Sequence, residues 1–426
     1  MPPFKVFITV YAFLKKLTYF FEVGAILYIV KCNFGGIMGA IGGVVDFRNS
    51  NIDFSALNGI RRALSLRGRG ESVAYLDSGI GMFYNSDGFT ESKQPILSER
   101  RGYKTSMVID SDFLDGQSVI EAYRVSGVEF VGMLKASFAI AVYDAERRML
   151  LLARDRKGRR PLYYCAKSGK VLFASEPKGL LSLKKGATQV NREALSSHLT
   201  SPIGIYGASD IYPDIFEVRC GECILFSEFG MSKFFYRENQ NKKISHKKRI
   251  SQAGIPLEPF CYADEKTVIA SLEDALVAFD IPQFDAYMPS LCSLFSSVDE
   301  QNRIFQFKDY MKRYSLSYAY EREDRLSAFY GKMGVGVMTR LCENEADYMN
   351  NEAREALRIL TDLFFSLDRN DMLFVRRIFG DAKMNCLMRI FDQGREIKED
   401  TAHIVRILGM IYQAVELSRL REIELV

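Results

Sequence analysis

The stretch RDRKGRRPLYY, Arg154 to Tyr164, lies between two segments of short apolar runs. It follows MLLLA (Met149 to Ala153) and precedes KSGKVLFASEPKGLL (Lys167 to Leu181). Short runs rich in β-branched, aliphatic and aromatic residues, separated by charged and glycine-containing turns, are typical of strands in hairpins. The stretch therefore indicates a charged turn that links two successive hairpins.

Each of these hairpins has its own tight turn. AERR (Ala145 to Arg148) joins FAIAVYD to MLLLA, and KSGK (Lys167 to Lys170) joins PLYYCA to VLFAS. Gly169 in the second turn can supply the positive φ that such a turn requires. With helices predicted over Ser118 to Tyr123 and Arg192 to Leu199, the pattern favours an α+β fold with layered sheets.

After about residue 256 the apolar spacing becomes helical. Near the end of the chain, one helix face is formed by apolar residues at i, i+3, i+4, i+7 and i+11, namely Ile404, Ile407, Leu408, Ile411 and Val415. The same spacing predicts helices over 266–279, 300–328, 350–366, 371–392 and 400–422. The C-terminal part is therefore expected to be mostly helical.

Composition is that of an ordinary globular protein. The 426 residues are 48% hydrophobic and 26% charged, which is enough length for two or three domains. A net charge of +4 is too small to indicate a nucleic-acid partner. The basic run KKISHKKR, Lys242 to Arg249, lies in a polar stretch and indicates a solvated linker over 236–256.

Cysteine and histidine usage argues against a metal site. The eight cysteines are scattered except for Cys220 and Cys223, and the three histidines (His198, His246 and His403) do not pair at metal-ligand spacing. Reduced cysteines in a cytoplasmic protein are therefore expected. An alternative location is a membrane, reached through the apolar segment Leu17 to Val30, but this segment carries Glu22 and is shorter than the about 20 residues that a spanning helix needs. Residues 1–37 are thus either a weak anchor or an extension ahead of a functional start at Met38.

A series of motifs carries a family resemblance. In order they are MGAIGG (Met38 to Gly43), LRGRG (Leu66 to Gly70), KQPI (Lys93 to Ile96), FAIAVYD, ARDRKGRRPLYY and FASEPKGLL. This order resembles the glutamine-hydrolysing domain of asparagine synthases, a class II glutamine amidotransferase domain. Over residues 38–235 the resemblance implies a four-layer αββα sandwich of the Ntn-hydrolase type. It also implies structural rather than catalytic roles for Arg67, Gly68, Arg154, Asp155, Gly158, Ser175 and Glu176.

The family's nucleophile is missing. In the family a cysteine at the mature N-terminus attacks the glutamine amide while its own α-amino group serves as the base. The matching position here is Gly39, followed by Ala40 where the family has glycine. Since glycine has no nucleophilic side chain, no catalytic residue is predicted.

The resemblance also predicts a reduced glutamine pocket. GIGMFYNSDG, Gly79 to Gly88, contains no arginine to clamp the glutamine carboxylate, and the family's NGEIYN segment has no counterpart. Asp115 matches the carboxylate that holds the substrate amino group, with Gln117 where glutamate is usual. A small amino-acid ligand is therefore a possible partner.

Residues 257–426 match a remnant of the family's synthase domain. In the family this domain uses ATP and magnesium through an SGG-x-DS loop, whose backbone N–H groups face the pyrophosphate. No SGG occurs in residues 236–426, so no cofactor is predicted. The segment Thr267 to Pro289 resembles the family's helix and D-x-P-x-x-D turn.

Three functions are consistent with these residues. The first is an asparagine synthase-like protein that lacks both glutaminase and adenylation activity. The second is a non-catalytic binding protein that pairs with a second copy or a paralogue. The third is an ATP-dependent amide-forming relative without glutaminase activity, against which the missing SGG-x-DS loop argues.

Overall fold

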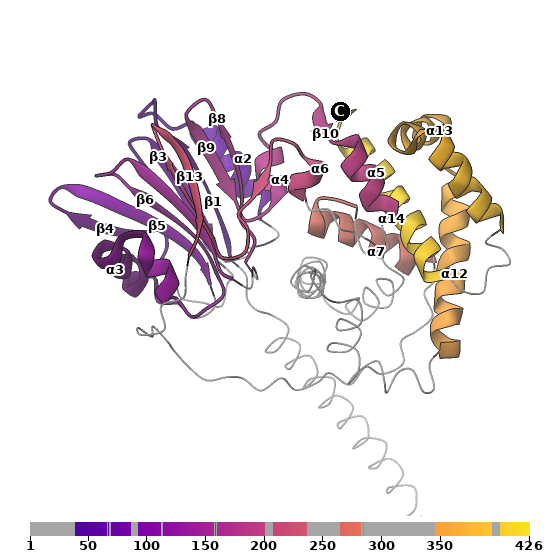
Figure 1. Ribbon diagram of the computed structural model, residues 1–426, viewed down its shortest axis with the longest axis horizontal. Helices are drawn as coiled ribbons and strands as arrows, with labels where there is room; N and C mark the ends of the chain where they lie inside the picture. Colours follow the sequence, from indigo (N-terminus) through magenta and orange to yellow (C-terminus); the bar gives the residue numbers. More distant parts are fainter. Residues whose placement is uncertain are drawn as a thin grey trace, which may run out of the picture.

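The computed structural model contains two antiparallel sheets stacked face to face, next to a group of helices from the C-terminal part of the chain (Figure 1). The residues that it describes are 39–65, 67, 70–86, 93–111, 114–156, 158, 160–200, 208–236, 265–282, 284, 346–393 and 401–426. Of the helices predicted from the sequence, 300–328 lies outside this part of the chain.

The first sheet has the strand order β11-β8-β9-β1-β3-β2 and is antiparallel throughout. Strand β1 is buried along its whole length, as a strand with packing on both faces must be. Its six strands are β1 (Ala40–Asp46), β2 (Ser72–Asp77), β3 (Ile80–Asn85), β8 (Tyr163–Lys167), β9 (Lys170–Ala174) and β11 (Phe216–Glu217).

The second sheet has the order β13-β12-β7-β6-β5-β4, again antiparallel. Gln94 extends this sheet beside β5: its side-chain amide donates to the Ile109 carbonyl and accepts from the Ile109 N–H. The six strands are β4 (Ile96–Arg100), β5 (Tyr103–Ser111), β6 (Phe138–Asp144), β7 (Met149–Arg154), β12 (Glu222–Ser227) and β13 (Gly230–Phe235).

Both predicted hairpins are confirmed. Strand β6 pairs with β7 across the AERR turn, and β8 pairs with β9 across Ser168 and Gly169. Ser168 has φ 52° and Gly169 has φ 77°. Two consecutive positive φ values in a two-residue turn match the right-handed twist of the strands that it joins. The charged stretch from Arg154 onward therefore connects one sheet to the other.

Helices cover the outer faces of both sheets. Helix α2 (Phe54–Ala63) and the short α4 (Pro177–Leu181) pack on the first sheet, and α3 (Gly116–Ser126) with the 3₁₀ helix η2 (Gly127–Met133) packs on the second. Side chains of β1 alternate between the two faces of its sheet, and Ile41 is one of those that point into the core between the sheets. The predicted four-layer αββα sandwich is confirmed.

The C-terminal part of the chain is largely helical, and the helices predicted at 266–279 and 350–366 are present. The helix predicted at 371–392 is interrupted by a kink at Gly380, whose φ of 73° is not helical. The predicted helix 400–422 needs a correction, because it ends at Leu420 and residues Ile423–Leu425 form strand β14, which pairs in parallel with β10. Its residues Ile423, Glu424 and Leu425 alternate between apolar and charged, which is the two-residue period of a strand. The elements here are β10 (Thr188–Val190), α5 (Arg192–Thr200), α6 (Ala208–Ile211), α7 (Glu265–Phe279), α12 (Ala346–Phe365), α13 (Arg369–Gln393) and α14 (Thr401–Leu420).

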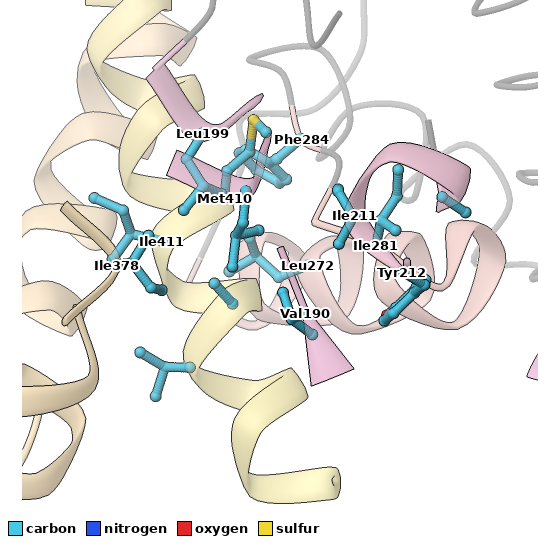
Figure 2. Packing of buried hydrophobic residues seen from close by; sticks show 14 of the residues in the cluster. Val190, Leu199, Ile211, Tyr212, Leu272, Ile281, Phe284, Ile378, Met410 and Ile411 are labelled. Atoms are coloured by element: carbon cyan, nitrogen blue, oxygen red, sulfur yellow. The ribbon is translucent and has the colours of Figure 1, made fainter. Parts of the chain in front are cut away.

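One hydrophobic core continues from the first sheet into the C-terminal helices. Figure 2 shows side chains from β10, α5 and α6 packed against those of α7, α13 and α14. Leu272, Ile378 and Met410 are all buried in this cluster. The same cluster includes residues of β1 and α2. The hydrophobic core therefore includes residues on both sides of the predicted linker 236–256, of which residues 237–256 lie outside the described part of the chain.

His198 on α5 gives the fold a dependence on pH. It is fully buried, and its Nε2 lies 2.7 Å from the Pro282 carbonyl oxygen, to which it donates. Burial lowers the pKa of His198 from 6.5 to about 4, and the Arg406 cation acts in the same direction while the carbonyl opposes it. Between about pH 4 and pH 6.5, His198 therefore binds a proton more readily in the unfolded chain than in the folded one.

We expect the free energy of unfolding to fall by about 3 kcal/mol through His198 as the pH drops from 6.5 to 4, at about 1.36 kcal/mol per pKa unit. Above pH 6.5 this stabilisation is fully present. Urea titrations at pH 7 and pH 4.5 check this with His198→Gln, which keeps an N–H donor but does not titrate. An identical loss of stability in both proteins would contradict the prediction.

Among the described residues, no helix is long and apolar enough to cross a membrane. The apolar segment Leu17 to Val30 lies outside them.

Candidate functional site

Gly39 lies buried at the start of β1, and the ring of Tyr84 occupies the space beside it. A Cβ atom on residue 39 would lie 2.5 Å from Cε2 of Tyr84 and 2.9 Å from its hydroxyl oxygen. Tyr84 is itself buried and lies opposite Ile41 in the β1–β3 ladder, in the core between the sheets. The space that a side chain at residue 39 would need is therefore filled.

Arg67 donates from all three of its side-chain nitrogens around this position. It follows α2, and its Nε lies 2.9 Å from the Gly39 carbonyl oxygen. One terminal nitrogen is 2.7 Å from Oδ2 of Asp110, and the other is 3.0 Å from Oε1 of Glu176. All three charged side chains are buried. Burial lowers the pKa of Arg67, but the two carboxylates outweigh it and raise the pKa above its ordinary value.

Three further charged side chains extend this group. Arg160 lies 3.4 Å from the second oxygen of Asp110, and Lys178 Nζ lies 3.4 Å from Oε2 of Glu176. Lys178 Nζ is also 3.4 Å from Oδ1 of Asp280, at the end of α7. We call these six side chains the buried ionic cluster: Arg67, Asp110, Arg160, Glu176, Lys178 and Asp280. Its three cations and three anions balance one another, as burial of charge requires.

Ser175 ties the start of β1 to the end of β9. Its Oγ accepts a hydrogen bond from the Ile41 N–H at 2.9 Å, and its own N–H donates to the Ile41 carbonyl at 2.9 Å. Glu176 follows immediately and joins the buried ionic cluster. The structure thus brings Arg67, Ser175 and Glu176, three of the residues named from the sequence, together near the start of β1.

The remaining motif residues build a separate turn. Arg154 ion-pairs with Glu217 and donates to the carbonyl oxygens of Val218 (2.9 Å) and Gly158 (2.7 Å). Asp155 accepts from the Phe138 N–H at 3.2 Å, and its carbonyl accepts from Gly158. Gly158 has φ 57°, the left-handed region that favours glycine. These contacts hold the end of β7 to the chain before β12. Gly68 lies outside the described residues.

Asp115 is exposed at the N-terminus of α3, where it caps the helix. Its Oδ2 accepts from the Ser118 N–H at 3.0 Å and from the Ser118 hydroxyl at 2.6 Å. Asp is among the preferred residues at this position. Capping gives Asp115 a structural role, while its role in holding a substrate amino group stays a prediction. Gln117 is exposed in the first turn of the same helix.

Several residues of the site were not predicted from the sequence. They are Tyr84, Asp110, Arg160, Lys178 and Asp280. Asp110 gave one signal, since it ends the apolar run SMVID on β5, and a charge in such a run is buried only when paired. The others carry no local signal, because each depends on contacts between segments distant in the chain.

The family's ATP and magnesium site belongs to its synthase domain. Among the described residues, no group of three or more His, Cys, Asp or Glu side chains could hold a metal ion. The SGG-x-DS loop of the family is also missing from residues 236–426 of the sequence.

Comparisons with known proteins identify the class of the double-sheet domain. Residues 110–237 match the glutamine amidotransferase domain family. The chain carries a class II glutamine amidotransferase domain of the asparagine synthase family.

Several of the curated proteins to which the chain is similar are asparagine synthetases. The glutamine-hydrolyzing asparagine synthetases 2 and 3 of Bacillus subtilis (strain 168) are 28% identical over 169 residues and 25% identical over 187 residues. These matches cover 35% and 44% of this chain but only 23% and 28% of the relatives. Amidase chyE of Penicillium rubens is 35% identical over 89 residues, 20% of this chain and 13% of that protein. The chain therefore spans about a quarter or less of the length of these relatives.

One solved structure to which part of the chain is similar is the glutamine phosphoribosylpyrophosphate amidotransferase from B. subtilis. It is 14% identical, with a TM-score of 0.31, over 47% of this chain and 50% of that chain.

Proposed function

We propose that this protein is an asparagine synthase-like relative that retains the amidotransferase scaffold but hydrolyses no glutamine and forms no asparagine. The observation that carries the proposal is the packing of Tyr84 against Gly39, which leaves no room for a side chain at the position of the family's nucleophile. Glycine itself has no group that could attack an amide. The protein would then act as a non-catalytic scaffold.

The reduced substrate pocket supports the same proposal. Strand β3, in the stretch where the family carries its carboxylate clamp, reads IGMFYN and is buried along its length. Phe83 and Tyr84 cannot replace the paired donors with which an arginine holds a carboxylate. Arg67 is already engaged, because it is buried and its positive charge is paired with Asp110 and Glu176.

Two assays on the full chain test the proposal. The first incubates the protein with glutamine and measures glutamate. The second supplies ATP, magnesium, aspartate and ammonium, and measures AMP and asparagine, so that a missing glutaminase does not hide a working synthase. We expect no product above a no-enzyme control in either assay, with a glutamine-hydrolyzing asparagine synthetase of Bacillus subtilis as the positive control.

Glutamate formation would overturn the first half of the proposal. AMP formation tied to asparagine would overturn the second half and would point to the third function considered from the sequence, an ATP-dependent ligase without glutaminase activity.

A further inference from the structure

The end of α7 and the start of α4 interlock through reciprocal hydrogen bonds. Oδ2 of Asp280 accepts from the Lys178 N–H at 3.0 Å. In return, Nζ of Lys178 donates to the Val277 carbonyl at 2.5 Å, one of the carbonyls that a helix end leaves without an intrahelical partner. A cation at this end is also favoured by the helix dipole. Each helix end thus supplies a hydrogen-bond partner for a backbone group at the other.

Asp280 is held in place by its backbone as well. It has φ 62°, a left-handed conformation that Asp adopts more readily than most residues. Its carbonyl oxygen accepts from the Tyr212 hydroxyl at 2.6 Å, and both groups are buried. The turn after α7 is therefore fixed by contacts to α4 and to the residue that follows α6.

Lys178 connects this turn to Gly39. Burial opposes the charge on Lys178, but Asp280 and Glu176 raise its pKa to about 12, so it stays a cation. Glu176 pairs in turn with Arg67, which donates to the Gly39 carbonyl. The path from α7 to Gly39 consists of buried ion pairs, and removing one member would leave a partner buried and unpaired.

Two other features join the same parts of the chain. Strand β14 pairs in parallel with β10, and the hydrophobic core runs without a break from β1 and α2 to α14. Gln413 on α14 also donates to the Leu272 carbonyl of α7 at 2.8 Å. The C-terminal helices thus share the core and the ionic contacts of the double sheet.

We propose that the double sheet and the C-terminal helices open and close as one cooperative unit, with Lys178 as the positioning residue that links α7 to the Gly39 site. A change that displaces α7 would then alter the surroundings of Gly39. This inference concerns the folding unit and is independent of whether the protein hydrolyses glutamine.

Hydrogen–deuterium exchange of the full chain tests it, with mass spectrometry of peptides from α7 (residues 265–279) and β1 (residues 40–46). Opening as one unit gives both segments the same opening constant, within about threefold. Lys178→Met should raise both constants about 100-fold, since it removes the buried cation that pairs with Asp280 and leaves Glu176 with Arg67 alone. Lys184→Met is the matched control, because Lys184 pairs with Asp214, an exposed partner. It should change both constants by less than about threefold.

Asp280→Asn keeps the proposal testable if Lys178→Met does not fold. Asn tolerates the same backbone conformation and retains an oxygen for the Lys178 N–H, but it removes the charge. It should raise the opening constants of both segments together, by a smaller factor than Lys178→Met does. Exchange of α7 more than about tenfold faster than β1 in the unmodified protein would overturn the proposal, and so would a Lys178→Met effect no larger than that of Lys184→Met.

Discussion

Replacing Arg67 with methionine is expected to lower the free energy of unfolding by about 3–5 kcal/mol, the range for removing one partner from a buried ion pair. Asp110 and Glu176 would each lose their shortest cationic contact, at 2.7 and 3.0 Å. The Gly39 carbonyl would lose its donor as well. Methionine is an unbranched apolar side chain that cannot donate a hydrogen bond.

Urea unfolding followed by far-ultraviolet circular dichroism measures this effect, since the chain contains no tryptophan for fluorescence. Arg62→Met is the control: Arg62 is an exposed residue on α2, and its replacement should change stability by less than about 0.5 kcal/mol. Arg67→Lys should fall between the two, because one ammonium group cannot reproduce the fixed fork of a guanidinium. An Arg67→Met protein within about 1 kcal/mol of the unmodified one would show that the pairs contribute little.

Arg67 also shows which features of the site can be predicted from the sequence and which cannot. The LRGRG motif marked Arg67 as structural, through a family resemblance. Its partners could not be found in this way, because Asp110 and Glu176 lie 43 and 109 residues along the chain. A motif identifies a residue that matters, whereas its contacts depend on how distant segments come together.

The positions of the strands can be predicted from the sequence more readily than the partners with which they pair. The two hairpins follow from apolar runs around short turns, which are local features. Strand β14 was missed because its three residues follow directly on an amphipathic helix, and its partner β10 is over 230 residues away in the sequence. Local periodicity carries no information about such a partner. The same holds for Asp280, whose contact with Lys178 spans 102 residues.

The family resemblance gave the position of Gly39 but not its surroundings. Nothing in the sequence IGMFYN says that the Tyr84 ring packs against residue 39, since this follows from the β1–β3 register. A glycine could equally have left an open pocket. The structure shows a filled one, which changes the expected result of restoring the nucleophile.

Gly39→Cys is therefore expected to destabilise the protein rather than to create a glutaminase. The new Cβ would meet the Tyr84 ring at 2.5–2.9 Å, closer than real Cβ contacts come, so the buried ring must move. Overpacking of this kind costs about 1–3 kcal/mol. Gly39→Ala should show a similar loss, because the conflict begins at Cβ and not at the sulfur.

A double-mutant cycle with Tyr84→Ala assigns the cost to this contact. Tyr84→Ala alone should lose about 3–5 kcal/mol as a large-to-small change in the core. Gly39→Ala should then add little, which gives a favourable coupling of about 1–3 kcal/mol between the two sites. Tyr84→Phe is the control: it keeps the ring, so Gly39→Ala should cost as much stability in this background as in the unmodified protein. A Gly39→Cys or Gly39→Ala protein as stable as the unmodified chain would contradict this prediction and would mean that the Tyr84 ring moves aside at little cost.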